Sequence, residues 1–114
     1  MDPEWKIRQF ATGPSLRVEI VDEVTGLAFD LTGATVVAHM YDSVNDAAIF
    51  TDHPVTVEDP TAGILRLDWD QVGDTDTAGT MIMEFEVTLA SGDVETYPQG
   101  GYLSIVIRTD LNGG

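Results

Sequence analysis

The sequence predicts an all-β domain whose strands are antiparallel and either pack as a two-sheet sandwich or close into a barrel. Three observations lead to this fold class. One long stretch alternates between apolar and polar residues, and eight or nine short strand-like stretches follow one another at a spacing of roughly ten residues. No segment keeps the 3.6-residue period of a helix.

The longest alternating stretch is residues 79–93. Five apolar side chains fall on one side of an extended chain: Met81, Met83, Phe85, Val87 and Leu89. Threonine and glutamate occupy most of the other side, and in a helix these glutamates would interrupt any apolar stripe. Burying the five side chains contributes about 8–15 kcal/mol, which is comparable to the whole net stability of a typical domain. We therefore expect a central strand whose apolar face packs on a second sheet.

Shorter runs of the same kind predict the remaining strands. In the clearest run Leu16, Val18 and Ile20 alternate with Arg17 and Glu19. Turn-forming residues separate the runs, and a brief apolar run at 27–29 lies between two of these turns. The predicted strands are 4–10, 15–21, 34–41, 47–50, 54–58, 64–69, 79–89, 94–97 and 102–108.

Glycine and proline mark the turns. Gly26 and Gly92 stand where a turn needs a positive φ. Residues 59–63 combine Asp, Pro and Gly as in a type I or type II turn. Pro54 cannot donate a ladder hydrogen bond, so we expect it at a sheet edge or at the start of a strand.

The length of 114 residues suits a single domain. We expect residues 1–12 to form an N-terminal arm or edge strand, residues 13–111 the sandwich, and residues 112–114 a C-terminal tail. The absence of cysteine excludes disulfides and thiol chemistry. The first ten residues hold no apolar run, so we expect no signal peptide and no membrane insertion.

The charge is strongly negative, with 20 acidic residues against five Lys and Arg and a net charge of −15. Such a surface repels nucleic acid, so we expect no direct nucleic-acid binding. It also destabilises the fold by self-repulsion, which salt near 1 M screens because the Debye length falls to about 3 Å. One hypothesis is therefore a protein from a high-salt cytoplasm, such as that of a haloarchaeon or its virus. The alternative is an ordinary acidic surface that keeps the protein soluble.

The residue types that carry catalysis are sparse. None of the four serines stands in a Gly-x-Ser-x-Gly motif. His39 is expected to be a satisfied core or interface histidine on a strand, and His53 an exposed loop residue. Glu84 and Glu86 share a strand face, as a pair of catalytic carboxylates could, but we expect them to be ordinary solvent-exposed surface residues. We expect no enzyme activity and no cofactor.

Two Asp-x-Asp pairs are weak candidates for metal ligands because calcium sites use aspartate at alternate positions. They are Asp68, Asp70, Asp74 and Asp76. The 12-residue calcium loop with its closing glutamate is missing, and such pairs arise by chance in an acidic chain.

Large side chains near the ends of the domain are candidates for an interface, since aromatic residues are enriched at interface cores. The candidates are Trp5, Ile7, Phe10 and Tyr102. Trp69 is expected to fill the sandwich core instead.

Several short motifs, in their order along the chain, resemble those of one known family. They are Thr25-Gly26, Asp30-Leu31-Thr32-Gly33-Ala34-Thr35-Val36, Asp59 with Gly63, Asp74-Thr75 with Gly79, Glu84-Phe85-Glu86-Val87, Ser91-Gly92-Asp93, and Pro98 before Ile105. Over residues 13–111 the chain resembles the N-terminal immunoglobulin-like domain of siphophage baseplate upper proteins.

This resemblance implies an antiparallel immunoglobulin-like β-sandwich without catalysis. It implies a structural protein that docks in symmetric copies onto the tail, baseplate or capsid of a virion assembled in the host cytoplasm. Its partners would be other virion proteins and copies of itself, and the acidity adds a haloarchaeal tailed virus. The alternatives are a capsid decoration or head–tail connector protein, and a carbohydrate- or calcium-binding module.

Overall fold

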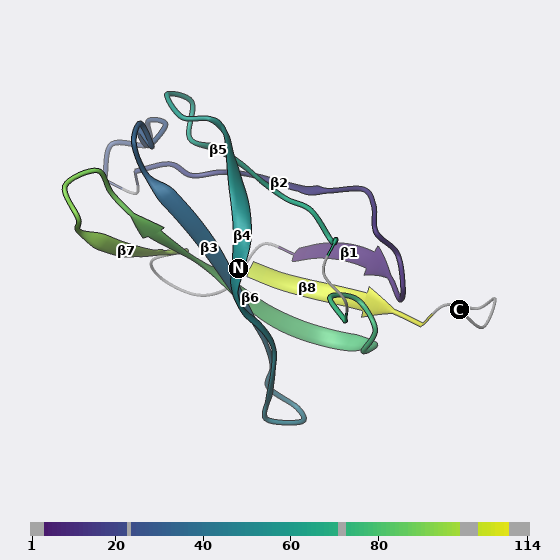
Figure 1. Cartoon of the computed structure of the whole chain (residues 1–114). Helices are drawn as coiled ribbons and strands as arrows, with labels where there is room; N and C mark the ends of the chain where they lie inside the picture. Colours follow the sequence, from purple (N-terminus) through teal and green to yellow (C-terminus); the bar gives the residue numbers. More distant parts are fainter. Residues whose placement is uncertain (1–3, 23, 71–72, 99–102, 110–114) are drawn as a thin grey trace.

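The structure is a computed structural model that describes residues 4–22, 24–70, 73–98 and 103–109. The described residues form eight strands and no helix, which confirms the all-β fold class. The strands are β1 (Glu4–Arg8), β2 (Leu16–Glu19), β3 (Thr35–Asp42), β4 (Ala47–Asp59), β5 (Ile64–Leu67), β6 (Gly79–Thr88), β7 (Val94–Tyr97) and β8 (Leu103–Arg108) (Figure 1).

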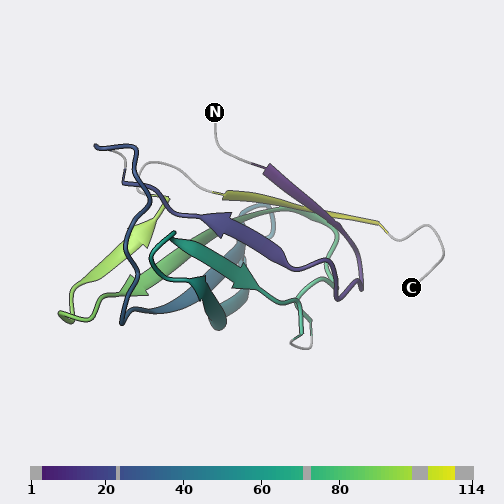
Figure 2. The same ribbon diagram turned by 90° about the horizontal axis from the view of Figure 1, so that it is seen from above.

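The strands pair in one continuous path, β1-β8-β6-β3-β4-β5-β2, with β7 added beside β6. The path folds back on itself at β4 (Figure 2). We call β1, β8, β6, β7, β3 and the first part of β4 the large sheet. The last part of β4 with β5 and β2 is the small sheet. The two ends of the path, β1 and β2, are not paired with each other, so the described strands form a barrel-like sandwich that is open along one side.

One strand, β4, passes from the large sheet to the small sheet. Its residues 47–55 pair with β3, and its residues 56–59 pair with β5. The prediction of two separate strands at 47–50 and 54–58 is therefore wrong. The polar residues between them do not form a turn, because Asp52 takes a φ of 54° in an irregular part of the β3–β4 ladder and the strand continues beyond it.

The expectation of purely antiparallel strands is corrected at one place. Every pairing between the described strands is antiparallel except that of β1 with β8, which is parallel from Glu4 opposite Ser104 to Arg8 opposite Arg108. These two strands come from opposite ends of the chain. Since no short turn connects them, nothing local fixes their relative direction.

The long strand β6 lies in the middle of the large sheet and has the predicted burial pattern. Its side chains at 81, 83, 85 and 87 are buried, and those between them are half-buried. Leu89 lies just past the strand and is partly buried against the same core. Trp69, which follows β5, is also buried in this core as expected.

Turn glycines behave as predicted. Gly26 and Gly92 have φ values of 72° and 94°. Pro54 stands opposite Val37 in the part of β4 that pairs only with β3, at the edge of the large sheet. The run at 27–29 is not a strand, because it contributes only an isolated bridge between Val21 and Ala28.

Candidate functional site

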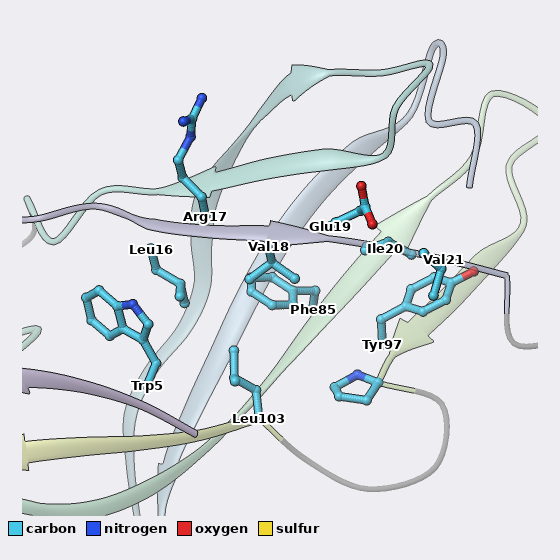
Figure 3. Close-up of a pocket in the computed structure, with 11 residues that line it drawn as sticks. Trp5, Leu16, Arg17, Val18, Glu19, Ile20, Val21, Phe85, Tyr97 and Leu103 are labelled. Atoms are coloured by element: carbon cyan, nitrogen blue, oxygen red, sulfur yellow. The ribbon is translucent and has the colours of Figure 1, made fainter. Parts of the chain in front are cut away.

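A cavity of about 400 Å³ lies along the open side of the sandwich. It separates β2 from the large sheet, and we call it the seam. Leu16 and Val18 of β2 point into it, whereas Arg17 and Glu19 point away from it (Figure 3). The apolar residues that line it come from both sheets: Trp5, Leu16, Val18, Ile20, Phe85, Tyr97 and Leu103.

Within the described part of the chain, the edge of β2 that borders the seam carries backbone groups that no other strand pairs with. β2 pairs with β5 alone among the described strands. On the β5 side the Ile20 N–H donates to the carbonyl of Gly63 at 2.8 Å, in register with the β2–β5 ladder. Because successive residues of a strand direct their N–H and C=O groups to opposite edges, Arg17 and Glu19 present theirs to the seam. Such an edge is a template for another strand.

The outer face of the small sheet brings cations together. Arg17 stands directly opposite Arg66 in the β2–β5 ladder. Glu58 lies between them: it forms an ion pair with Arg17, and its Oε2 is 3.1 Å from Nη1 of Arg66. Two of the five basic residues of an acidic chain therefore share one carboxylate on this face.

Asp68, one of the predicted metal ligands, is held by these neighbours instead. Its Oδ1 accepts a hydrogen bond from the Ser15 hydroxyl and lies 3.2 Å from Nε of Arg66. The Ser15 hydrogen bond keeps the pKa of Asp68 below its usual value; partial burial opposes this shift and Arg66 reinforces it.

A second feature is a cluster of three side chains that we call the His53 cluster: His53, Asp70 and Asp74. Nε2 of His53 is 2.8 Å from Oδ2 of Asp74 and 3.9 Å from Oδ1 of Asp70. His53 and Asp74 are buried, and Asp70 is exposed. The expectation of an exposed loop histidine is wrong, because β4 continues through this position and turns the ring inward. There it packs against Phe50, with ring centroids 4.6 Å apart.

Both ring nitrogens of His53 face acceptors. Nδ1 lies 2.9 Å from the Pro54 carbonyl, and Nε2 is at hydrogen-bond distance from the Asp74 carboxylate. Each ring nitrogen that carries a proton can donate to the acceptor that it faces. The three side chains are also the one set of three potential metal ligands within 4.8 Å of one another in the described ranges. Imidazole and carboxylate groups suit divalent transition metals such as Zn²⁺.

The structure therefore brings together two of the four predicted metal candidates, Asp70 and Asp74. Asp68 is not a member of this three-residue set, and Asp76 is exposed with its backbone carbonyl accepting from the Gln9 side chain. Sequence reasoning missed His53, although a signal was present. The apolar alternation of Val57 and Val55 in β4, continued backward by two residues, places His53 on the inward face.

His39 has a different environment. Its Nδ1 accepts from the Asp52 N–H at 3.1 Å, and its Nε2 lies 3.3 Å from the carboxylate of Glu86. A neutral ring with its proton on Nε2 makes both contacts. The expectation of a satisfied histidine is confirmed, and the carboxylate of Glu86 is engaged by this ring.

The interface candidates are placed as follows. Trp5 is half-buried and stacks on Trp69 of its own chain, with ring centroids 5.4 Å apart. Ile7 is only 5% exposed and belongs to the core of its own chain, and its role at an interface stays a prediction. Phe10 is 49% exposed and has a φ of 65°. Tyr102 lies outside the described residues.

The residues that carried the resemblance act mainly in turns and strand starts. Asp30 accepts from the N–H and the hydroxyl of Thr32, and these hydrogen bonds lower the pKa of Asp30. Leu31 is buried, and Gly33 has a positive φ of 77°. The Thr75 hydroxyl donates to the carbonyl of Ala11 at 2.9 Å. The two remaining positions lie at strand ends: Gly79 opens β6 and Pro98 follows β7.

No family model matches the chain, and no curated protein sequence matches it. Within the described ranges, no helix has the length and apolar character to cross a membrane.

Proposed function

We propose that this chain is a non-catalytic structural subunit of a tailed-virus particle that acts by symmetric assembly at the tail or baseplate. The resemblance to the immunoglobulin-like domain of siphophage baseplate upper proteins supports the place of action. The net charge of −15 supports a haloarchaeal virus, because a high-salt cytoplasm screens the repulsion that this charge creates. Its partners would be other virion proteins and further copies of the chain.

The strand connectivity supports an immunoglobulin-like sandwich. In that fold strands B, E and D form one sheet, and strands C, F and G form the other. Here β2, β5 and the end of β4 stand in the places of B, E and D. The strands β3, β6 and β8 stand in the places of C, F and G. The strand β1, in the place of strand A, pairs with β8 and not with β2, so β1 and β2 are the two unpaired ends of the path of described strands.

The single observation that carries the proposal is the open edge of β2 beside the apolar seam. An unpaired strand edge next to apolar surface is the feature that folded proteins normally cover, because it pairs readily with another chain. Strand addition at such an edge is a common way to join subunits. The fold leaves this edge open along a cavity of about 400 Å³, which favours a function in assembly.

Position in the particle separates this proposal from the second virion role, a capsid decoration or head–tail connector protein. Antibodies raised against the folded chain, applied to purified particles in immunogold electron microscopy, should label the tail tip. Label confined to the head would favour the second role. Absence of the chain from particles, checked by mass spectrometry, would contradict both.

The His53 cluster favours one further candidate function, a cation-binding module. Calorimetry with Ca²⁺ and Zn²⁺ tests it on the isolated chain. Glycan-array binding by the isolated monomer would favour the carbohydrate-binding alternative.

A further inference from the structure

We propose that a second copy of this chain docks on the free edge of β2, so that two small sheets join across a two-fold axis at Val18. This inference rests on the proposed assembly function and names the surface and the partner that the function would use. A two-fold axis makes the same strand of both copies run antiparallel. Antiparallel pairing is also the direction that already joins the strands of the small sheet.

The backbone of β2 allows this pairing. The Ile20 N–H donates to Gly63, and the Ile20 carbonyl accepts from the Phe29 N–H at 2.9 Å; both bonds lie on the β5 side. By alternation, the N–H and C=O groups of Arg17 and Glu19 point to the opposite edge. If Arg17 stands opposite Glu19 of the second copy, each such pair exchanges two hydrogen bonds. The two-fold axis produces that pair twice.

Charge selects one register. With Val18 opposite Val18 of the second copy, each Arg17 stands beside a Glu19. A shift by two residues places either Arg17 opposite Arg17 or Glu19 opposite Glu19, and like charges directly opposite each other are destabilising. A shift by one residue would turn the apolar face of one strand outward. The register centred on Val18 therefore pairs the free backbone N–H and C=O groups and also places opposite charges beside each other.

The same register also joins apolar surface. It places Leu16 of one copy opposite Ile20 of the other, and Val18 opposite Val18. These three side chains line the seam. Leu16 and Ile20 are already buried within one copy, whereas Val18 is half-buried. Pairing at the free edge of β2 would therefore bring the apolar walls of the two seams together and withdraw chiefly Val18 from water.

Docking would also balance charge on the outer face of the small sheet. Arg17 stands opposite Arg66 within the small sheet, and the two share Glu58. The Arg17 side chain is 66% exposed, so it can reach a further carboxylate. Docking would supply Glu19 of the second copy on the other side of Arg17. The electrostatic complementarity is local, although each chain carries a net charge of −15.

A cysteine cross-link tests the geometry. The chain has no cysteine, so Val18→Cys introduces a single thiol. Directly opposite residues at a non-hydrogen-bonded position have Cα atoms about 4.5 Å apart, within the span of a disulfide. The matched control is Val44→Cys, because Val44 is 83% exposed between β3 and β4. Under mild oxidation in about 1 M KCl, which screens the net repulsion, Val18→Cys should form covalent dimers at least about tenfold faster than the control. Equal rates would overturn the proposal.

Charge exchange tests the register. Arg17→Glu or Glu19→Arg places like charges opposite each other twice and should raise the dimer dissociation constant about tenfold in sedimentation experiments. An equimolar mixture of the two variants should recover wild-type affinity, because both glutamates of the first variant then face arginines of the second. Thermal melting verifies that each variant folds. An oligomer that neither variant weakens would overturn this interface and leave the assembly function standing, since that function is tested separately in particles.

Discussion

His53 and Asp74, 21 positions apart in the sequence, lie with Nε2 and Oδ2 2.8 Å from each other. Their side chains are only 2% and 3% exposed. The contact connects β4, where that strand passes between the sheets, to the segment that precedes β6. On its inner side the His53 ring packs against Phe50, which in turn contacts Trp69. The pair therefore anchors the segment before β6 to the sandwich core.

Asp74→Ala should destabilise the domain by about 1–3 kcal/mol, because it removes the hydrogen-bond partner of the buried Nε2 of His53. The measurement is urea unfolding followed by tryptophan fluorescence. Asp76→Ala is the matched control, since Asp76 is exposed two positions away and its change should stay within about 0.5 kcal/mol. Equal midpoints for the two variants would show that the buried contact contributes nothing.

Chelation should leave the melting temperature unchanged. A separation of 2.8 Å between Nε2 of His53 and Oδ2 of Asp74 is that of a hydrogen bond, and this bond satisfies both atoms without a cation. Differential scanning fluorimetry with and without EDTA measures the effect. A fall in melting temperature that Zn²⁺ or Ca²⁺ reverses would instead favour the cation-binding module.

Phe85→Ala should cost about 3–5 kcal/mol, because Phe85 is 2% exposed in the middle of β6 and its removal leaves a cavity. Val94→Ala in β7 provides the control, since Val94 is 58% exposed and should change the stability by no more than about 0.5 kcal/mol. Chemical denaturation measures both. A loss of stability for Phe85→Ala as small as that of the control would contradict the position of Phe85 in the core.

Ser15→Ala should reduce stability near neutral pH and have little effect in acid. The Ser15 hydroxyl lowers the pKa of folded Asp68, so its contribution is complete above the unfolded carboxyl pKa of about 3.9. That contribution disappears as the pH falls through the lower pKa of the folded state. Urea unfolding of both proteins at about pH 6 and about pH 2.5 measures the difference. A difference that stayed constant across this range would contradict the assignment.

The alternation of side chains was enough to predict β6, its buried face and the all-β class, because a period of two residues does not depend on which strand lies alongside. The strand β4 could not be delimited in the same way. Its polar centre is typical of a turn, but the strand continues through it: Asp52 takes a left-handed φ, its N–H donates to His39, and the ladder to β3 resumes on both sides. The parallel pairing of β1 with β8 could not be predicted either, because the sequence of a strand does not determine which other strand it pairs with.

The candidate sites were predictable to different degrees. Asp70 and Asp74 were selected as acidic residues, but the side chain that joins them, His53, is brought in by β4 from a distant position. The seam depends on the two unpaired ends of the strand path, which no local pattern reveals. The sequence predicted that Arg17 and Glu19 lie on the solvent-exposed face of a strand. Because that strand has an open edge, these two residues can also contact a second copy of the chain.

A sandwich that functions by joining other subunits through its open edge should associate in solution. Sedimentation velocity of the purified chain measures this association over a range of protein concentrations in about 0.15 M and about 2 M KCl. We expect a discrete oligomer that becomes more populated at the higher salt, where the repulsion between acidic chains is screened. A monomer at every concentration and at both salt levels would contradict the assembly function.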